Sequence, residues 1–343
     1  MTEPEAYKRC QQSTNRLSAA CNRLWLGNLL AIFGLGAATL LSLFARTFWL
    51  GDLAANLRVQ LVLGLIVTAV LTSACRQWRW LLLLLLLLTV HLPFFGSLIQ
   101  QTSTDTSEPA ITVTTANVFT GNTNYAAVEA ELRSADADVI AVLELSSDLR
   151  KHLASTFQDD YRFSLADSQD NGNFGIGLYS RHSFEFAKLT YFNDESIQSI
   201  VASLTVKGRR FQLVATHTLP PMDERGFNHR NRHLQRLAME VQRLRKQAPD
   251  VPVIVMGDLN LTPWSPLFAG FENSSGLRRA SQAFDATPTW YRYPGFPFGL
   301  VLDHVLTTKE LQCSSCRVGS DVGSDHRFVT VDLGVATGRL SPE

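Results

Sequence analysis

The chain has 343 residues and no net charge at neutral pH, a length that allows one large domain or two smaller units. Charge is unevenly distributed: residues 1–100 hold eight basic and three acidic side chains, and the remainder hold 23 basic and 28 acidic. The two parts therefore carry +5 and −5. The acidic balance of the larger part does not favour a nucleic-acid partner, because such domains usually attract polyanions through a basic surface.

Three apolar segments within the first hundred residues predict a membrane anchor. They cover residues 24–45, 59–75 and 80–99, and the last contains eight consecutive leucines. About 20 apolar residues suffice to cross a bilayer as a helix, and a helix that is apolar on every side is not typical of a soluble core. A cleaved signal peptide would be shorter than the first segment and would not be followed by two more. We expect three transmembrane helices in residues 1–100.

Lys and Arg positions predict how this anchor is oriented. The N-terminal tail carries four basic residues, Arg76 and Arg79 lie between the second and third segments, and no basic residue then occurs before Arg133. Cytoplasmic loops are enriched in Lys and Arg, so the N-terminus is expected in the cytoplasm. The C-terminal domain is then on the periplasmic or extracellular side of the inner (plasma) membrane. Losing the short second segment as a span would reverse this placement.

A polar linker at residues 101–110 precedes a domain at 111–335, and residues 336–343 form a tail. Apolar, β-branched segments predict strands, and periodic apolar residues predict helices at 124–134 and 229–246. The predicted strands are 111–119, 138–145, 174–180, 200–206, 211–218, 251–256, 300–306 and 328–333. This pattern indicates an α+β sandwich with flanking helices. Cys313 and Cys316 could close as a disulfide in an oxidising compartment or remain free thiols.

Polar side chains occur at the ends of these predicted strands. They are Asn117, Glu144, His217, Asp258, Asn260, Asp303, Asp325 and His326. One such residue is ordinary in a turn, but this many over about 210 residues suggests one shared site. Carboxylates and amides are ligands for hard divalent cations, and imidazoles can bind or protonate a phosphate oxygen. Asp258 and Asn260 are two residues apart, so on a strand their side chains would point the same way.

No Gly-rich phosphate loop and no Gly-x-Ser-x-Gly elbow occurs in the sequence. Metal-assisted hydrolysis of a phosphate ester is therefore the reaction that these residues fit best.

Residues 110–335 resemble the endonuclease/exonuclease/phosphatase (DNase I-like) superfamily of magnesium-dependent phosphoesterases. The resemblance rests mainly on GDLN at 257–260 and GSDHRFV at 323–329, supported by ANV at 116–118, LEL at 143–145, THTLPP at 216–221 and LDHVL at 302–306. The membrane-anchored arrangement is similar to bacterial members. The resemblance implies a four-layered α/β sandwich, in which two packed mixed β-sheets are flanked by helices.

The resemblance also implies roles for the polar residues. Glu144 would be the main ligand of Mg²⁺, or alternatively Mn²⁺, together with Asn117 and Asp325. Asp258 would orient and deprotonate the attacking water. His326, held by Asp303, would contact the scissile phosphate, as would His217 and Asn260. Simpler structural roles are a strand-end cap for Asp303, a β-bulge residue for Asn117 and a core histidine for His217.

Two departures from the superfamily pattern leave the substrate open. Phe119 stands where relatives often have an acidic residue, and no acidic partner for His217 is found near residues 173–181. Tyr179 and Arg181 are candidates for substrate contact, and the aromatic segment 290–298 could line the site or touch lipid.

Three functions compete. The first is a phosphoesterase acting on a lipid headgroup or another small phosphoester. The second is an extracytoplasmic nuclease for DNA or RNA, and the third is a catalytically silent scaffold or sensor. The sequence leaves the oligomeric state open.

Overall fold

The computed structural model describes residues 24–99, 108–193, 197–282, 285–292 and 299–335. The chain divides into two compact units, Met1–Phe95 and Gly96–Glu343, called here the anchor unit and the catalytic unit. Most of the predicted N-terminal tail and linker, the C-terminal tail, and residues 293–298 of the aromatic segment lie outside the described residues.

The anchor unit is helical. It contains the helix Leu24–Ser42, followed by α2 (Trp49–Asn56), α3 (Arg58–Ala74), α4 (Trp78–His91) and the 3-10 helix η1 (Leu92–Ile99). Two helices, Leu24–Ser42 and Trp78–Gly96, are long and apolar enough to cross a membrane. Helices α2 and α3 form a pair bent by 67°, which adds a third candidate if the pair is one span. The described residues thus contain two or three candidate spans, rather than three clear ones.

A polar link joins three helix ends within the anchor unit. The Nδ1 atom of His91 lies 3.5 Å from an Nη atom of Arg58, and its Nε2 atom lies 3.1 Å from Oγ1 of Thr39. Arg58 also donates to the carbonyl oxygen of Ser42, at the C-terminus of the first helix. A guanidinium at this position satisfies a carbonyl that has no partner within its own helix. The link therefore fixes the helices to one another.

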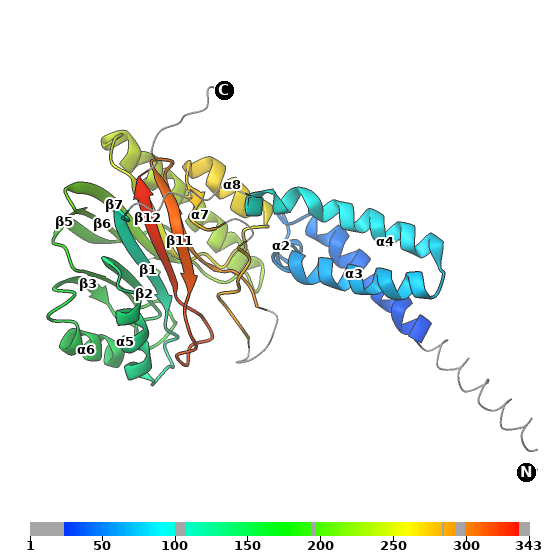
Figure 1. The fold of residues 1–343 in the computed structure, drawn as a ribbon, viewed down its shortest axis with the longest axis horizontal. Helices are drawn as coiled ribbons and strands as arrows, with labels where there is room; N and C mark the ends of the chain where they lie inside the picture. The colour runs from blue at the N-terminus through cyan, green and yellow to red at the C-terminus, as the bar shows by residue number, and fades with distance from the viewer. Residues whose placement is uncertain (1–23, 100–107, 194–196, 283–284, 293–298, 336–343) are drawn as a thin grey trace, which may run out of the picture. The chain divides into compact units, whose positions relative to one another are not determined.

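Two six-stranded mixed sheets form the centre of the catalytic unit (Figure 1). The first has the order β11-β12-β1-β2-β4-β3. Its strands are β1 (Ile111–Asn117), β2 (Val139–Leu143), β3 (Phe163–Asp167), β4 (Ile176–Ser180), β11 (Leu311–Val318) and β12 (Val329–Val335). The second has the order β5-β6-β7-β8-β10-β9. Its strands are β5 (Phe184–Tyr191), β6 (Gln198–Val206), β7 (Arg209–His217), β8 (Val253–Asp258), β9 (Arg278–Arg279) and β10 (Asp303–Thr307).

Each sheet contains one parallel pair of strands, β1 with β2 and β7 with β8. Parallel neighbours need a crossover connection, which helices α5 (Tyr125–Ser134) and α7 (Glu224–Gln247) provide. Asp223 caps α7, because its carboxylate accepts from the backbone N–H of Gly226 at 2.6 Å. The helix consequently begins five residues before the predicted start at 229.

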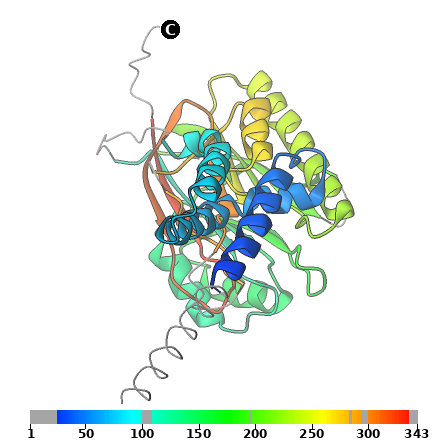
Figure 2. The ribbon, with the colours of Figure 1, turned by 90° about the vertical axis from the view of Figure 1, so that its right-hand side faces the viewer.

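Alternating side chains explain the four layers. In β8, Ile254 and Met256 face the core between the sheets, whereas Val253 and Val255 face the outer core under α7 and α8 (Pro266–Ser275). The first sheet is covered in the same way by α5 and α6 (Ser147–Thr156). Helices α7 and α8 lie next to each other in both views (Figures 1 and 2). Two packed mixed sheets flanked by helices were predicted, and the prediction is confirmed.

The cysteines of the catalytic unit are free thiols. Cys313 and Cys316 both lie on β11, and a bulge between Cys313 and Ser315 lets both pack against the core between the sheets.

Candidate active site

The two parallel pairs of strands bring four predicted site residues to one edge of the sandwich. Asn117 ends β1, Glu144 follows β2, and His217 and Asp258 end β7 and β8. His217 and Asp258 are partners in the strand register, and Asp258 is also paired with Asp303 of the antiparallel strand β10. The carboxyl ends of parallel strands meet at the same edge, which explains why residues far apart in sequence converge.

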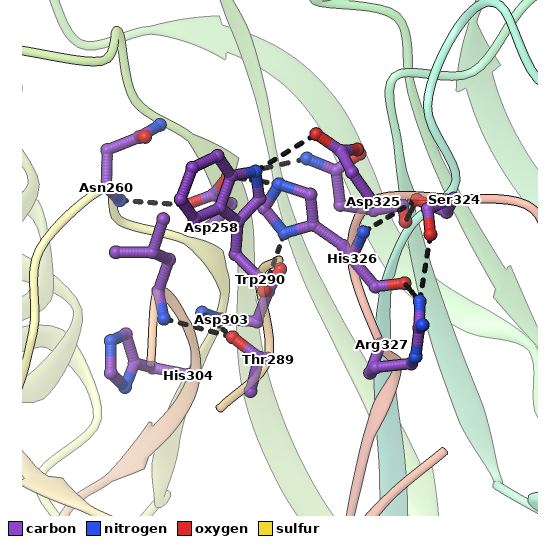
Figure 3. A network of polar contacts seen from close by, with 12 residues as sticks. Asp258, Asn260, Thr289, Trp290, Asp303, His304, Ser324, Asp325, His326 and Arg327 are labelled. Atoms are coloured by element: carbon purple, nitrogen blue, oxygen red, sulfur yellow. Dashed lines mark hydrogen bonds and ion pairs between the residues drawn. The ribbon is translucent and has the colours of Figure 1, made fainter. Parts of the chain in front are cut away.

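Asp258 is at the centre of the site and is 1% exposed. Its Oδ2 atom lies 3.4 Å from Nε2 of His217, 3.7 Å from Nε2 of His326 and 3.4 Å from Nδ2 of Asn117. Its other oxygen accepts from the backbone N–H of Asn260 at 2.8 Å (Figure 3). His217, whose partner was left open by the sequence, therefore pairs with Asp258.

His326 lies between two carboxylates. Its Nδ1 atom is 2.8 Å from Oδ2 of Asp303, and the opposite nitrogen faces Asp258 (Figure 3). Thr289 holds Asp303 in place, because its hydroxyl accepts from the backbone N–H groups of Leu302 and Asp303, both at 3.0 Å. This arrangement agrees with the predicted contact between His326 and Asp303.

Burial and charge oppose each other in the pKa values of the two histidines. Burial lowers the pKa of His326, but the carboxylates of Asp303 and Asp258 outweigh it and raise the pKa to about 10. Burial likewise opposes protonation of His217, and Asp258 and Glu144 raise its pKa. Asp258 itself would be neutral by burial alone, but its hydrogen bond with His217 and the charge of His326 lower its pKa. His326 therefore carries a proton at neutral pH, and the carboxylates around His217 favour its protonated form.

Glu144 and Asn117 form the second half of the site. Nδ2 of Asn117 donates to Oε1 of Glu144 at 2.9 Å, and the backbone N–H of Thr120 donates to Oε2 at 3.3 Å. Both Asn117 and Glu144 are buried. Asn117 is thus in contact with both Glu144 and Asp258, and it connects the two sheets.

Asp325 reaches the site from the loop before β12. Its Oδ2 atom accepts from the indole N–H of Trp290 at 3.0 Å (Figure 3). Ser324 positions this loop, because its hydroxyl donates to the carbonyl of Asn117 and accepts from the N–H of His326. Trp290 and Ser324 were not predicted as site residues. The only sequence signal for Trp290 was its place in the aromatic segment.

The donor chemistry of the site fits a divalent cation. Four carboxyl side chains and two imidazoles meet here, from Asp258, Asp303, Glu144, Asp325, His217 and His326. All of them are buried or half-buried. An excess of buried carboxyl groups is costly without a compensating cation. Oxygen-rich sites of this kind suit Mg²⁺ and Mn²⁺.

A second donor set is geometrically possible. Single ligand atoms of Asp258, Asp303 and His326 lie within 4.8 Å of one another. A metal bound there would displace the proton of His326, whose pKa of about 10 disfavours its loss. A cation held by the carboxylate and amide oxygens of Glu144 and Asn117 would not displace the proton of His326.

Three sequence predictions need correction. Asn260 does not extend the strand beside Asp258: its φ is +47° and its side-chain N–H donates to the carbonyl of Thr218. Tyr179 is in the core under α5 and α6, 3% exposed. Arg181 follows the far end of β4 and pairs with Asp136. Antiparallel pairing places Ile176, not Ser180, beside Leu143 and the site, so Tyr179 and Arg181 lose their geometric support as substrate contacts.

Comparisons with known proteins agree with this arrangement. The sequence profile described as the Endonuclease/Exonuclease/phosphatase family matches residues 114–326. Similar solved structures include the human Nocturnin catalytic domain, with 18% identity, 67% of this chain and 96% of that chain covered, and a TM-score of 0.55. Sphingomyelinase C from Streptomyces griseocarneus has 20% identity, coverage of 65% and 99%, and a TM-score of 0.51. Truncated Caenorhabditis elegans TDP2 has 15% identity, coverage of 66% and 97%, and a TM-score of 0.53.

No curated protein matches the sequence significantly. At these identities the structural similarities establish the fold of the catalytic unit and leave its substrate open.

Proposed function

The chain belongs to the Endonuclease/Exonuclease/phosphatase family, whose members are metal-dependent phosphoester hydrolases, and we propose that it is a membrane-anchored phosphoesterase. It uses water to hydrolyse a phosphodiester or phosphomonoester. The observation that carries this proposal is the convergence of two His–Asp pairs with the carboxylates of Glu144 and Asp325 at one edge of the sandwich.

The residues have separate tasks in this reaction. Glu144, Asn117 and Asp325 would hold Mg²⁺ or Mn²⁺, which when bound offsets negative charge on the phosphoryl oxygens. Asp258 stays ionised because its pKa is lowered, so it accepts a hydrogen bond from the attacking water. It receives the proton of that water as the water oxygen bonds to phosphorus and the ester P–O bond breaks, and the departing oxyanion takes a proton from solvent. Protonated His326 and His217 donate to phosphoryl oxygens, where charge accumulates in the transition state. Asn260 lies next to them at the half-buried rim.

A lipid headgroup or another small phosphoester is the favoured substrate. Two or three helices of the anchor unit are long and apolar enough to hold the chain in a membrane, and the catalytic unit carries most of the acidic residues in the chain. A small or membrane-borne phosphoester requires no extended basic surface, whereas a nucleic acid does.

The test of the proposed function is hydrolysis of bis-p-nitrophenyl phosphate by the full chain in detergent, with Mg²⁺, Mn²⁺ or EDTA. We expect turnover with either metal, none with EDTA, and a loss of about 10²–10⁴-fold in kcat for Asp258→Asn. Asp223→Asn is a matched control, because Asp223 caps α7 outside the site. Turnover that survives EDTA, or that is unaffected by Asp258→Asn, would disprove the proposal.

A nuclease is the second candidate, and one feature of α7 favours it. Arg225, Arg232, Arg236 and Arg243 are exposed, and their spacing of seven, four and seven residues places them on one face over about 27 Å. Such a stripe could follow a phosphate backbone. If the protein is a nuclease, its affinity for DNA should decrease steeply as the salt concentration rises. The double variant Arg232→Gln/Arg236→Gln should make this dependence of affinity on salt less steep. A catalytically silent scaffold is the remaining alternative, which any metal-dependent turnover would exclude.

The placement of the catalytic unit outside the cytoplasm is also part of the proposal. It rests on the basic N-terminal tail and on α2 and α3 acting as one span. An alkaline phosphatase reporter fused to the C-terminus should be active, because that enzyme folds only outside the reducing cytoplasm. An inactive reporter, with a fluorescent cytoplasmic reporter at the same site, would place the unit inside.

A further inference from the structure

Three residues at the edge of the candidate site have left-handed backbone conformations. The φ angles are +60° for Phe119, +57° for Glu144 and +47° for Asn260. A positive φ costs a residue with a side chain roughly 1 kcal/mol or more, and such residues gather at functional sites. Glu144 already has a task in the proposed reaction, and the side chain of Asn260 donates to the carbonyl of Thr218. Phe119 has no such task.

The turn that contains Phe119 is hydrogen-bonded to both Asn117 and Glu144, two of the proposed metal ligands. The backbone N–H of Phe119 donates to Oδ1 of Asn117 at 3.2 Å, and its carbonyl accepts from the N–H of Asn122 at 2.8 Å. The next residue, Thr120, donates to Glu144 through its backbone N–H and its hydroxyl. Phe119 therefore lies directly beside the proposed ligands.

The fold does not require an aromatic side chain at this position. The ring of Phe119 is 41% exposed, and among the described residues it belongs to none of the core clusters. Asn or Gly would adopt a φ of +60° at lower cost. Gly121 makes room for the ring, because a Cβ there would come within 2.9 Å of it. An exposed ring held in a costly conformation suggests a contact with a ligand.

A second ring lies on the other side of Glu144. Phe174 precedes β4, and its ring packs against His217 with 5.1 Å between the centroids. The strand order β1-β2-β4 places Phe119, Glu144 and Phe174 in sequence along the edge of the sheet. The polar centre is thus bordered by apolar surface on both sides. Phe174 is half-buried and packs against His217, so Phe119 is the more exposed of the two rings.

We infer that Phe119 is a specificity-determining residue that contacts an apolar substituent of the phosphoester, either an aromatic ring or a hydrocarbon chain. This inference rests on the proposed function and names the class of substrate that the site selects. Rings pack favourably against both kinds of substituent. The contact should favour an apolar phosphoester over a methyl ester by roughly 5- to 50-fold in affinity.

Inhibition constants test the inference independently of the chemical step. Methylphosphonate, phenylphosphonate and hexylphosphonate would be competed against bis-p-nitrophenyl phosphate, with Mg²⁺ and the full chain held in amphipol. The wild type should bind the phenyl or the hexyl compound roughly 5- to 50-fold more tightly than methylphosphonate. Phe119→Asn keeps the backbone conformation without the ring, so it should lose this preference and bind methylphosphonate unchanged. Phe119→Tyr keeps the ring and should keep the preference.

Phe163→Asn is the matched control, because Phe163 is similarly exposed, at 37%, and pairs with Ser180 at the far end of the sheet. Preference for phenylphosphonate alone indicates an aryl or nucleobase substituent, and preference for hexylphosphonate indicates a lipid chain; either supports the inference. The inference would be overturned if Phe119→Asn changed the inhibition constants of all three phosphonates equally, or if the wild type showed no preference for the phenyl or hexyl compound over methylphosphonate. Failure of the wild type to hydrolyse bis-p-nitrophenyl phosphate would instead overturn the proposed function.

Discussion

The anchor unit and the catalytic unit each contain a buried histidine between two polar partners, and the partners differ in kind. His91 has the guanidinium of Arg58 at Nδ1 and the hydroxyl of Thr39 at Nε2. A guanidinium can only donate, so Nδ1 of His91 accepts and the imidazole is neutral. His326 has carboxylates on both sides. Carboxylates only accept, so Nδ1 donates to Asp303, and the charges of Asp303 and Asp258 raise the pKa of the ring to about 10.

This comparison distinguishes a histidine with a structural role, His91, from one with a proposed catalytic role, His326. Around His91 the hydrogen-bond partners are a guanidinium and a hydroxyl, and neither exchanges a proton with the ring at neutral pH. Around His326, His217 and Asp258 the partners are acids and bases within 4 Å of one another, so they can exchange protons. Buried clusters of ionisable groups with shifted pKa values are typical of catalytic sites. The type of neighbour, rather than burial, therefore distinguishes the two sites.

The largest expected effect comes from exchanging the same residue in both places. His326→Gln should lower kcat by about 10²–10⁴-fold, because it removes the proton donor to the phosphate. His91→Gln should leave kcat within about twofold, because His91 only links helices. Both variants would be assayed as full chains with bis-p-nitrophenyl phosphate. If His91→Gln lowers kcat as much as His326→Gln does, the anchor contributes to the chemical step, and the distinction between the two histidines is wrong.

Metal binding should stabilise only the site with excess negative charge. At 100 times its dissociation constant, Mg²⁺ should stabilise the catalytic unit by about 2.7 kcal/mol. Glu144→Gln should abolish most of this gain and, without metal, should unfold at the same or a higher temperature than the wild type, because it removes repulsion. Calorimetry of the full chain with Mg²⁺ or EDTA measures both effects.

Glu310→Gln, at the opposite end of β10 from Asp303, is the control for this experiment. If Mg²⁺ stabilises Glu144→Gln as much as the wild type, the ion is held elsewhere, and the cluster of Asp258, Asp303 and His326 becomes the better candidate.

The sequence predicted the central strands well, because each is buried on both faces. Strands β2 and β8 are buried at every position and therefore appear as continuous apolar runs. Strands β5 and β11 mix exposed and half-buried positions, and neither was predicted. Helix α6 was missed for a similar reason, since Leu149 and Leu153 are its only buried residues and polar residues fill the rest.

The predicted site residues converge, but their directions could not be obtained from spacing alone. Asn260 turns away from strand geometry at a positive φ. Ile176 and Leu178 of β4 face the core between the sheets. Successive side chains of a strand point to opposite faces, so the next residue, Tyr179, faces the outer helices. The contact of Trp290 with Asp325 joins residues 35 positions apart through irregular loops, which no periodicity reveals.

His233 extends the comparison to a buried histidine without a charged partner. Its Nε2 atom lies 2.8 Å from the hydroxyl of Thr216. Burial, with the nearby His229 and His217, lowers its pKa to about 3. Below pH 6.5 this histidine binds a proton in the unfolded chain but stays neutral in the folded chain. The free energy of unfolding therefore decreases as the pH is lowered towards 3. Between pH 6.5 and 5 the loss should be about 2 kcal/mol.

His233→Asn should flatten this acid-side slope when the free energy of unfolding is measured by urea titration at several pH values. If its slope equals that of the wild type, His233 is protonated in the folded chain, and burial with a hydroxyl partner does not keep a histidine neutral.

The smallest expected effect tests whether the anchor network is structural. Thr39→Val removes the hydroxyl that faces Nε2 of His91, while keeping the shape of the side chain. Hydrogen bonds between apolar helices contribute about 0.6 kcal/mol on average, so unfolding of the anchor in mixed micelles with a denaturing detergent should shift by about that amount. Thr39→Ser keeps the hydroxyl and should not shift. Neither variant should change kcat, because the network links helices of the anchor unit and includes none of the proposed catalytic residues. A change in kcat with Thr39→Val would mean that the anchor is coupled to the reaction, and His91 would then have to be regarded as a functional residue.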